Sequence, residues 1–117
     1  MEDCIFCKIA KKEIPAEILF ESNNVIAFKD VNPIAPVHVL VIPKKHIKSV
    51  AELQEEDASL MGEIILSARK IAEDLEISQN GYKLLIRVGK YGGQEVDHLH
   101  LHLIGGAPLS EEIKPIS

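Results

Sequence analysis

Residues 98–104 read His-Leu-His-Leu-His-Leu-Ile, and this stretch determines the sheet and the chemistry that the rest of the chain must support. Alternate side chains of a β-strand share a face, so His98, His100 and His102 would form a row spaced by roughly 6.5–7 Å. The leucines between them would face a core. Imidazole serves as nucleophile, proton carrier or metal ligand near physiological pH. The row therefore predicts a functional site, and the alternative is a solvent-facing strand that is rich in histidine.

Length and composition indicate one soluble domain spanning residues 1–117. The chain is 46% hydrophobic and 26% charged, as is usual for a globular domain of this size. Its net charge of −5 argues against nucleic acid or an anionic membrane as the main partner. No apolar run approaches about 18 residues, and the first residues lack the basic flank and apolar core of a signal peptide. We therefore expect a cytoplasmic protein.

The order of apolar runs and turn residues predicts an α+β fold. The connections between most strands are too short for crossover helices, so we expect an antiparallel meander covered on one face by a helix. Apolar residues at steps of three and four predict a long helix over residues 55–76. A short helical turn over 4–12 and a short helix that begins at a capping box, Ser49 to Glu52, complete the helices. The expected strands are 18–20, 25–28, 38–42, 82–88 and 96–104.

A glycine-containing loop directly precedes the histidine row and reads Gly92-Gly93-Gln94-Glu95-Val96-Asp97. Glycines let the backbone approach a ligand closely, and their amides can point at an anion. Beside imidazoles, such a loop can form a phosphate pocket in which one imidazole attacks phosphorus while its neighbours hold its tautomer and carry protons. Taken alone, the glycine pair is a weak signal and more often an ordinary hairpin loop, but beside the histidine row it becomes a much stronger one.

Both cysteines belong to the segment Cys4-Ile5-Phe6-Cys7. In a reducing compartment this spacing indicates metal binding or redox chemistry rather than a structural disulfide. Two further ligands are needed for a zinc site, so the pair alone is only suggestive. The alternative is a pair of reduced cysteines packed as small apolar side chains. No thioredoxin-like pattern accompanies them to favour a redox role.

The histidine row resembles the His-φ-His-φ-His-φ-φ motif (φ, apolar) of the histidine-triad superfamily. The resemblance covers roughly residues 4–106 and is closest to the nucleotide-binding branch that includes the purine nucleoside phosphoramidases. Further blocks match in order and spacing: Glu13-Ile14-Pro15-Ala16, Ala27-Phe28-Lys29-Asp30, Ala35-Pro36-Val37-His38, Val41-Ile42-Pro43-Lys44-Lys45-His46-Ile47 and Gly92-Gly93-Gln94.

This resemblance implies a five-stranded antiparallel sheet with one long helix and a short N-terminal helix, paired into a homodimer. It also implies a hydrolase. His100 would attack the α-phosphorus of a purine nucleoside 5′-phosphoramidate or an acylated adenylate, giving a nucleotidyl-histidine. Water would then release AMP or GMP. His102 would lie beside the phosphate, and His38 would orient the site from the third strand.

The resemblance further implies a nucleotide-binding set. Asp30 would bind the ribose hydroxyls, although it could instead cap the proline-containing loop. Two positions depart from the pattern, because Glu95 replaces a Ser or Thr and Arg87 replaces an Asn. Glu95 would repel phosphate, and so would turn outward, hold a proton or select a cationic leaving group. Arg87 could grip phosphate, pair with Glu95 or be an ordinary surface residue. The remaining members are Ile14, Phe28, Val31 and Leu40, which could instead be core, and Gly93, Gln94 and Val96.

In zinc-bearing members of the superfamily, the matching positions add two histidines to the cysteine pair. The predicted ligands are therefore Cys4, Cys7, His46 and His98. Such a set leaves no open position, so the zinc would be structural and would fix the N-terminal segment.

Three other functions stay open from the sequence. The protein could hydrolyse dinucleoside polyphosphates. It could be a nucleotide-binding interaction module with negligible turnover, which Glu95 makes credible. It could also be a metal-binding protein that places all three imidazoles of the row on one ion.

Overall fold

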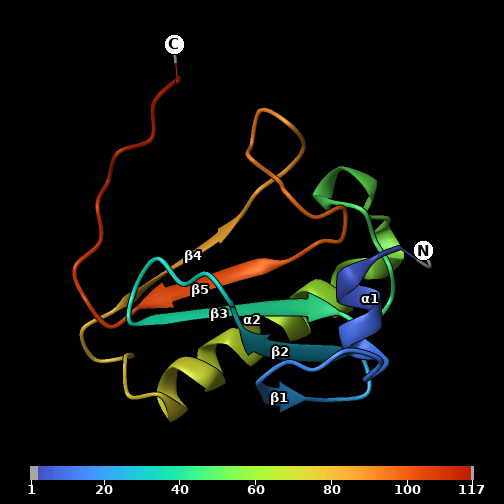
Figure 1. Cartoon of the computed structure of the whole chain (residues 1–117), viewed down its shortest axis with the longest axis horizontal. Helices are drawn as coiled ribbons and strands as arrows, with labels where there is room; N and C mark the ends of the chain where they lie inside the picture. The colour runs from blue at the N-terminus through green and yellow to red at the C-terminus, as the bar shows by residue number, and fades with distance from the viewer. Residues whose placement is uncertain (1–2, 117) are drawn as a thin grey trace.

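One antiparallel sheet organises the chain in the computed structural model, which describes residues 3–116 (Figure 1). Met1, Glu2 and Ser117, the ends of the expected domain, lie outside the described residues. The α+β class, the five antiparallel strands, the long helix and the short N-terminal helix are confirmed. The strands are β1 (Ile18–Glu21), β2 (Val25–Lys29), β3 (Val37–Pro43), β4 (Tyr82–Ile86) and β5 (Leu101–Gly105), and the helices are α1 (Ile5–Ala10), α2 (Ala58–Asp74) and the short 3-10 helices η1 (Val50–Glu52) and η2 (Glu55–Asp57).

The order of the strands is β1-β2-β3-β5-β4, so the expectation of a simple meander was wrong. β5 is the last strand in the chain, yet it pairs with β3 on one side and β4 on the other. Every residue of β5 is buried, whereas every residue of β4 is half-buried. β5 is therefore an interior strand with both edges paired, whereas β4 lies at the edge of the sheet.

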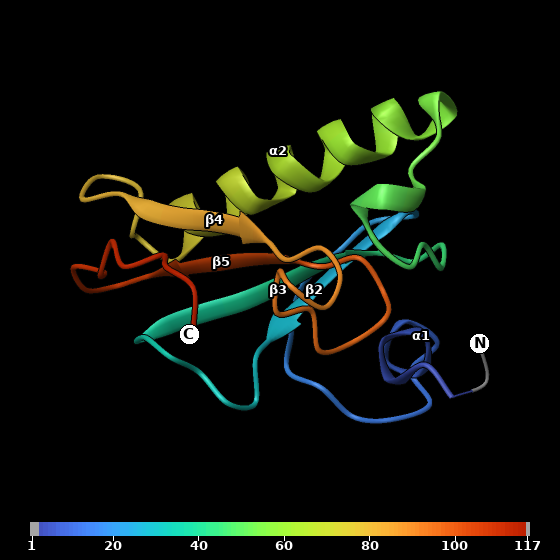
Figure 2. The same ribbon diagram turned by 90° about the horizontal axis from the view of Figure 1, so that it is seen from above.

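The two faces of the sheet carry different partners, because side chains alternate along each strand. Figure 2 shows α2 along one face and α1 beside the other. On the α2 face, Val39 and Val41 of β3 join the buried stripe of the helix, which includes Ile64 and Ala68. On the α1 face, the adjacent β3 residues Leu40 and Ile42 pack in a second cluster, which is made up of Phe6, Ile9, Ile26, Phe28, Leu40 and Ile42.

The predicted strand over 96–104 is wrong for its first half, because regular pairing begins only at Leu101. Before that residue, the backbone N–H of His98 donates to the carbonyl of Val96, and the N–H of Leu99 donates to Ile47. The alternation of the motif nevertheless persists, since Leu99, Leu101 and Leu103 all lie in the core on the α2 face.

Other boundaries shift less. The long helix predicted from residue 55 begins as η2 and continues as α2 only to Asp74, and Glu76 then adopts a positive φ of 60°. The fourth strand ends at Ile86, two residues before its predicted end. The short helix expected near Ser49 is η1, and the Ser49 hydroxyl accepts the N–H of Ala51 at 3.1 Å. Within residues 3–116, no helix has the length and apolar character needed to cross a membrane.

Candidate active site

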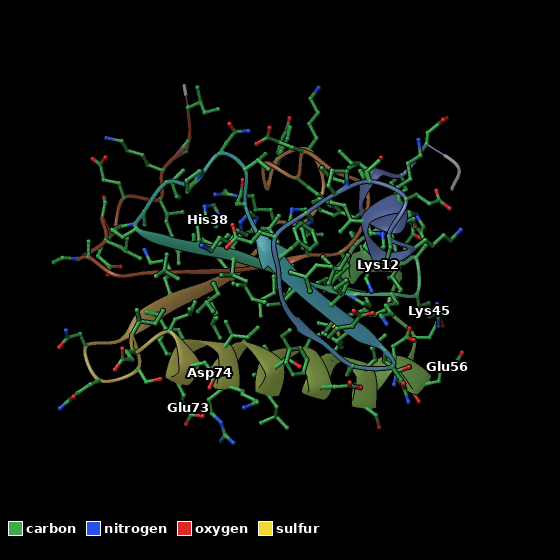
Figure 3. The ribbon with its side chains drawn as sticks, turned by 60° about the horizontal axis from the view of Figure 1, so that its bottom comes forward. Lys12, His38, Lys45, Glu56, Glu73 and Asp74 are labelled. Atoms are coloured by element: carbon green, nitrogen blue, oxygen red, sulfur yellow. The ribbon has the colours of Figure 1, made fainter. Side chains whose placement is uncertain are left out.

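A pocket of about 420 Å³ opens on the α1 face of the sheet. Figure 3 shows His38 on the side of the sheet away from Glu73 and Asp74 of α2. Gly93 and Gln94 of the predicted nucleotide-binding set are not among the lining residues. The predicted residues that do line it are Ile14, Phe28, Asp30, Val31, His38, Leu40, Arg87, Glu95, Val96, His100 and His102.

His100 lies in the wall of this pocket in a defined hydrogen-bonding state. Its Nδ1 is 2.7 Å from the carbonyl oxygen of His98. A carbonyl oxygen only accepts, so Nδ1 must carry the proton and donate it. In the neutral ring, Nε2 then keeps its lone pair. The side chain is 6% exposed, which leaves His100 a buried imidazole with a free nucleophilic nitrogen beside the pocket.

His38 holds the opposite tautomer. Its Nδ1 accepts the backbone N–H of Ile34 at 3.2 Å, so the proton of the neutral ring is on Nε2. That Nε2 lies 2.9 Å from Nδ1 of His102 and 3.3 Å from Oδ2 of Asp30. The strand register explains the approach to His102, because His102 of β5 pairs with the residue two positions after His38 in β3. Burial lowers the pKa of His38, and the carboxylate of Asp30 opposes this shift.

His102 completes the chain of imidazoles. Since its Nδ1 accepts from His38, its proton lies on Nε2, which is buried and has no hydrogen-bond partner among residues 3–116. Burial, with smaller contributions from His100, His38 and Arg87, lowers the pKa of His102 to about 4. The ring is therefore neutral at physiological pH and offers an unused N–H donor at the pocket.

Asp30 uses its two carboxylate oxygens differently. Oδ1 accepts the backbone N–H of Asn32 at 2.8 Å, which is the loop-capping role considered above, while Oδ2 faces His38. Donor atoms of Asp30, His38 and His102 lie within 4.8 Å of one another, as in a metal site. However, the hydrogen bond from Ile34 places the proton of His38 on the nitrogen that would ligate. This group is better described as a hydrogen-bonded cluster in which the single Nε2–H of His38 faces both His102 and Asp30.

A second cluster unites the predicted metal ligands. The donor atoms of Cys4, Cys7, His46 and His98 all lie within 4.8 Å of one another. Nδ1 of His98 is 3.3 Å from Sγ of Cys4 and 3.6 Å from Sγ of Cys7, and Nδ1 of His46 is 3.3 Å from the Cys7 sulfur. Tetrahedral zinc bonds imply an S···N separation of about 3.6 Å.

The state of the His98 ring also fits a metal ligand. Its Nε2 donates to the carbonyl of Pro43 at 2.8 Å, so Nδ1 keeps its lone pair and points toward the sulfurs. The four residues can therefore hold a metal ion. Of the three imidazoles in the 98–102 row, the cysteine-containing cluster includes only His98, and the cluster around Asp30 includes only His102. The geometry therefore does not favour three imidazoles on one ion.

The loop before the histidines is held by Gln94 rather than by its glycines alone. The Gln94 amide oxygen accepts the N–H of Gly89 at 2.9 Å, and its amide nitrogen donates to the carbonyls of Lys48 and Val96 at 2.7 and 3.0 Å. Gly92 has no room for a side chain, since an added Cβ would lie 2.4 Å from the carbonyl oxygen of Val88. This fixed loop presents Glu95 and Val96 to the pocket.

The two unusual charged residues both reach the pocket. Glu95 is exposed, and Arg87 is close enough to oppose protonation of His38 and His102. The possible Arg87–Glu95 ion pair is absent from the part of the chain that the structure describes.

The pocket wall that α1 contributes was not predicted from the sequence. Ile5, Phe6 and Ile9 line the pocket, and the Phe6 ring lies 5.1 Å from the His100 ring in an edge-to-face arrangement. The apolar residues of the predicted helical turn carried this signal, but the sequence does not say against which face of the sheet the turn packs. The other lining residues that were missed are Pro15, Ala16, Lys29, Asn32 and Ile34.

Residues 11–109 match the family model of the HIT domain. The chain belongs to the HIT family. It is 49% identical over 105 residues to protein HitA of Neisseria gonorrhoeae, covering 90% of this chain and 97% of the relative. It is 44% identical over 108 residues to the purine nucleoside phosphoramidase of Escherichia coli, covering 92% and 91%.

Solved structures agree with this HIT assignment. A HIT family hydrolase from Clostridium thermocellum superposes with a TM-score of 0.93 at 49% identity, covering 97% of this chain and 99% of that one. The resemblance to the histidine-triad superfamily drawn from the sequence is therefore confirmed.

Proposed function

We propose that this HIT family member is a hydrolase that cleaves purine nucleoside 5′-phosphoramidates or acylated adenylates to a nucleoside monophosphate. The observation that carries the proposal is the 2.7 Å hydrogen bond from Nδ1 of His100 to the His98 carbonyl, which leaves Nε2 as the nucleophile. The name of the Escherichia coli relative supports this substrate class.

The chemistry divides into two displacements at phosphorus. Nε2 of His100 forms a bond to the α-phosphorus while the phosphorus–nitrogen bond breaks, and the leaving nitrogen takes up a proton from solvent water and departs as the amine. Water then attacks the nucleotidyl-histidine, releases AMP or GMP and restores the imidazole. In both steps, Nε2–H of His102 can donate to a non-bridging oxygen, and His38 holds His102 in the required tautomer.

The pocket wall suits a purine nucleotide. Ile14, Phe28 and Leu40 supply an apolar surface for the base, and Val31, which is 87% exposed, lies at its rim. We assign the ribose hydroxyls to Asp30, through the carboxylate oxygen that does not cap the loop.

Polar groups at the other side of the pocket suit the phosphate and the leaving group. We assign the phosphate to Arg87, which lines the pocket beside the loop that Gln94 holds in place, and Gly93 of that loop lies next to the Arg87 side chain outside the lining. Glu95 cannot donate to a phosphate, so it suits a leaving group that carries a positive charge. This placement keeps the acidic side chain compatible with turnover.

We also propose that the metal cluster is a structural zinc site. Cys4, Cys7, His46 and His98 would hold the ion, and they fill all four tetrahedral positions. When bound, zinc would stabilise the N-terminal segment without contacting substrate. The homodimer and the cytoplasmic location stay predictions, and light scattering in solution would test the dimer.

The test compares adenosine 5′-phosphoramidate with a diadenosine polyphosphate, using the wild type and His100→Gly. We expect the wild type to release AMP faster from the phosphoramidate, and we expect His100→Gly to bind AMP without turnover. Glu73→Gln, on the exposed part of α2, is the control and should keep full activity. Turnover by His100→Gly would remove it as nucleophile.

Two other outcomes of the same comparison would favour a rival. Faster cleavage of the diadenosine compound would assign the protein to dinucleoside polyphosphate hydrolysis. AMP binding by the wild type with no hydrolysis of either compound would favour an interaction module.

A further inference from the structure

We propose that the metal cluster also positions the catalytic imidazole, with His98 and Phe6 as the positioning residues. This inference rests on the proposed role of His100 as nucleophile. It extends the function of the cluster from holding the N-terminal segment to setting the orientation and tautomer of a ring that is not itself a ligand.

The first connection runs through His98. Its ring is fully buried and is fixed at both nitrogens, by the Pro43 carbonyl on one side and by the two sulfurs on the other. The carbonyl of the same residue accepts the Nδ1 proton of His100. A movement of the His98 ring therefore moves the acceptor that defines which nitrogen of His100 is free.

The backbone at this point has little other support. Regular pairing with β3 and β4 begins at Leu101, three residues after His98. Ahead of Leu101, the Leu99 N–H to Ile47 hydrogen bond, at 2.7 Å, is the long-range backbone contact of the segment. The side chain of His98 is thus a main anchor for the carbonyl that holds His100.

The second connection runs through Phe6, which lies between the two cysteines in sequence. Its ring is 6% exposed and contacts the rings of His98 and His100 edge-on, with centroid separations of 6.0 and 5.1 Å. A third edge contact, at 5.5 Å, reaches Phe28 in the pocket wall. Phe6 therefore limits rotation of the His100 ring, which also packs against the His102 ring at a centroid separation of 4.9 Å.

Phe6 in turn depends on the cluster for its place. Helix α1 has six residues, far fewer than an isolated helix needs for stability in water. Its N-terminus is set by Cys4, whose Sγ accepts the N–H of Cys7 at 3.3 Å. Ligation of Cys4 and Cys7 would fix this turn, and loss of the metal would release it.

The pairing of the sheet does not depend on the four residues of the metal cluster. β3 and β5 are joined along Val37–Val41 and Leu101–Gly105, and the α2 face has its own core. Metal removal should therefore loosen the active site while the sheet stays folded. Loss of a residue that orients a metal ligand typically costs about 10–100-fold in metal affinity or activity. We expect loss of the cluster that orients His100 to lower kcat by a factor of the same order.

The experiment removes zinc from the wild type with a chelator, then adds Zn²⁺ back, and reads the His100 imidazole by ¹⁵N NMR at constant pH. We expect the loaded protein to show one tautomer, protonated at Nδ1, and the zinc-free protein to show a mixture. The kcat for adenosine 5′-phosphoramidate should fall 10–100-fold and recover with Zn²⁺. Cys4→Ser should resemble the zinc-free protein.

Matched variants separate positioning from general damage. Lys8→Ala changes a half-buried residue of α1 that belongs to neither the cluster nor the pocket, and it should preserve both the tautomer and kcat. Phe6→Ala should give a mixture of His100 tautomers in the zinc-loaded protein. Phe6→Leu should restore part of the preference for the tautomer protonated at Nδ1.

Three results would overturn the proposal. One is an unchanged tautomer and kcat in zinc-free protein whose β5 amide signals are intact, and another is global unfolding on zinc removal. The third is a wild type that takes up no Zn²⁺. If the loaded protein hydrolyses no phosphoramidate, the proposed function fails, but the NMR comparison still decides whether the cluster positions His100.

Discussion

Acidification should destabilise this protein through His102, within a pH window that its environment defines. Burial beside two other imidazoles lowers the pKa of His102 to about 4, against 6.5 for a free histidine. Between these two values the unfolded chain binds a proton that the native protein does not bind. Stability therefore falls as the pH drops from 6.5 to about 4, and this contribution is constant below 4 and absent above 6.5.

The magnitude follows from the size of the shift. One pKa unit corresponds to about 1.4 kcal/mol, so His102 accounts for a loss of about 3 kcal/mol across the window. His102→Asn replaces the ring by an amide that does not titrate but can still accept the Nε2 proton of His38. We expect the free energy of unfolding of this variant to change with pH by about 2–3 kcal/mol less than that of the wild type.

Urea unfolding at several pH values between 7 and 4 measures this difference. A chelator in every sample removes bound metal from both proteins, so that the comparison isolates the substituted ring. An NMR titration of the same ring gives its midpoint directly. A midpoint near 6.5, or equal pH dependence of the two proteins, would show that burial does not control the protonation of His102.

Two further substitutions test other parts of the structure. Asp57 is buried and accepts hydrogen bonds from the Gln54 N–H and the Lys45 ammonium group, both at 2.9 Å. Asp57→Ala should therefore lower the free energy of unfolding, measured in urea, by about 1–2 kcal/mol. Unchanged stability would contradict this. Gly92→Ala should weaken AMP binding in calorimetry, because its Cβ would collide with the Val88 carbonyl. Its control, Gly62→Ala in α2, has open space and should keep full affinity and gain about 0.5–1 kcal/mol of stability.

The alternation within residues 98–104 was sufficient to predict which leucines are buried. It was not sufficient to predict where the strand begins. The first two histidines engage main-chain carbonyls, of Pro43 and His98, and these hydrogen bonds hold a backbone path that a regular ladder would not allow. When a side chain competes with the strand ladder for a backbone hydrogen bond, the spacing of apolar residues does not reveal it.

Most of the site was predictable residue by residue, because the motifs supplied its residues; Gly93 and Gln94 are the exceptions that do not line the pocket. Eleven of the thirteen predicted catalytic and nucleotide-binding residues line one pocket, and the roles assigned to them stay predictions. The α1 wall and the interior place of β5 between β3 and β4 were missed for a shared reason. Both depend on contacts between distant segments, which local pattern does not encode.

Because β5 is the last strand in the chain, the candidate site is complete only when the whole sheet has formed. Asp30 and His38 belong to the first half of the chain, whereas His100 and His102 arrive with the final strand, beyond α2 and β4. Before this strand pairs, Asp30 and His38 lack the imidazoles of His100 and His102 that the proposed reaction needs. Such late pairing of remote segments is the slow part of folding. Under the proposed function, recovery of turnover during refolding would therefore report closure of the whole sheet.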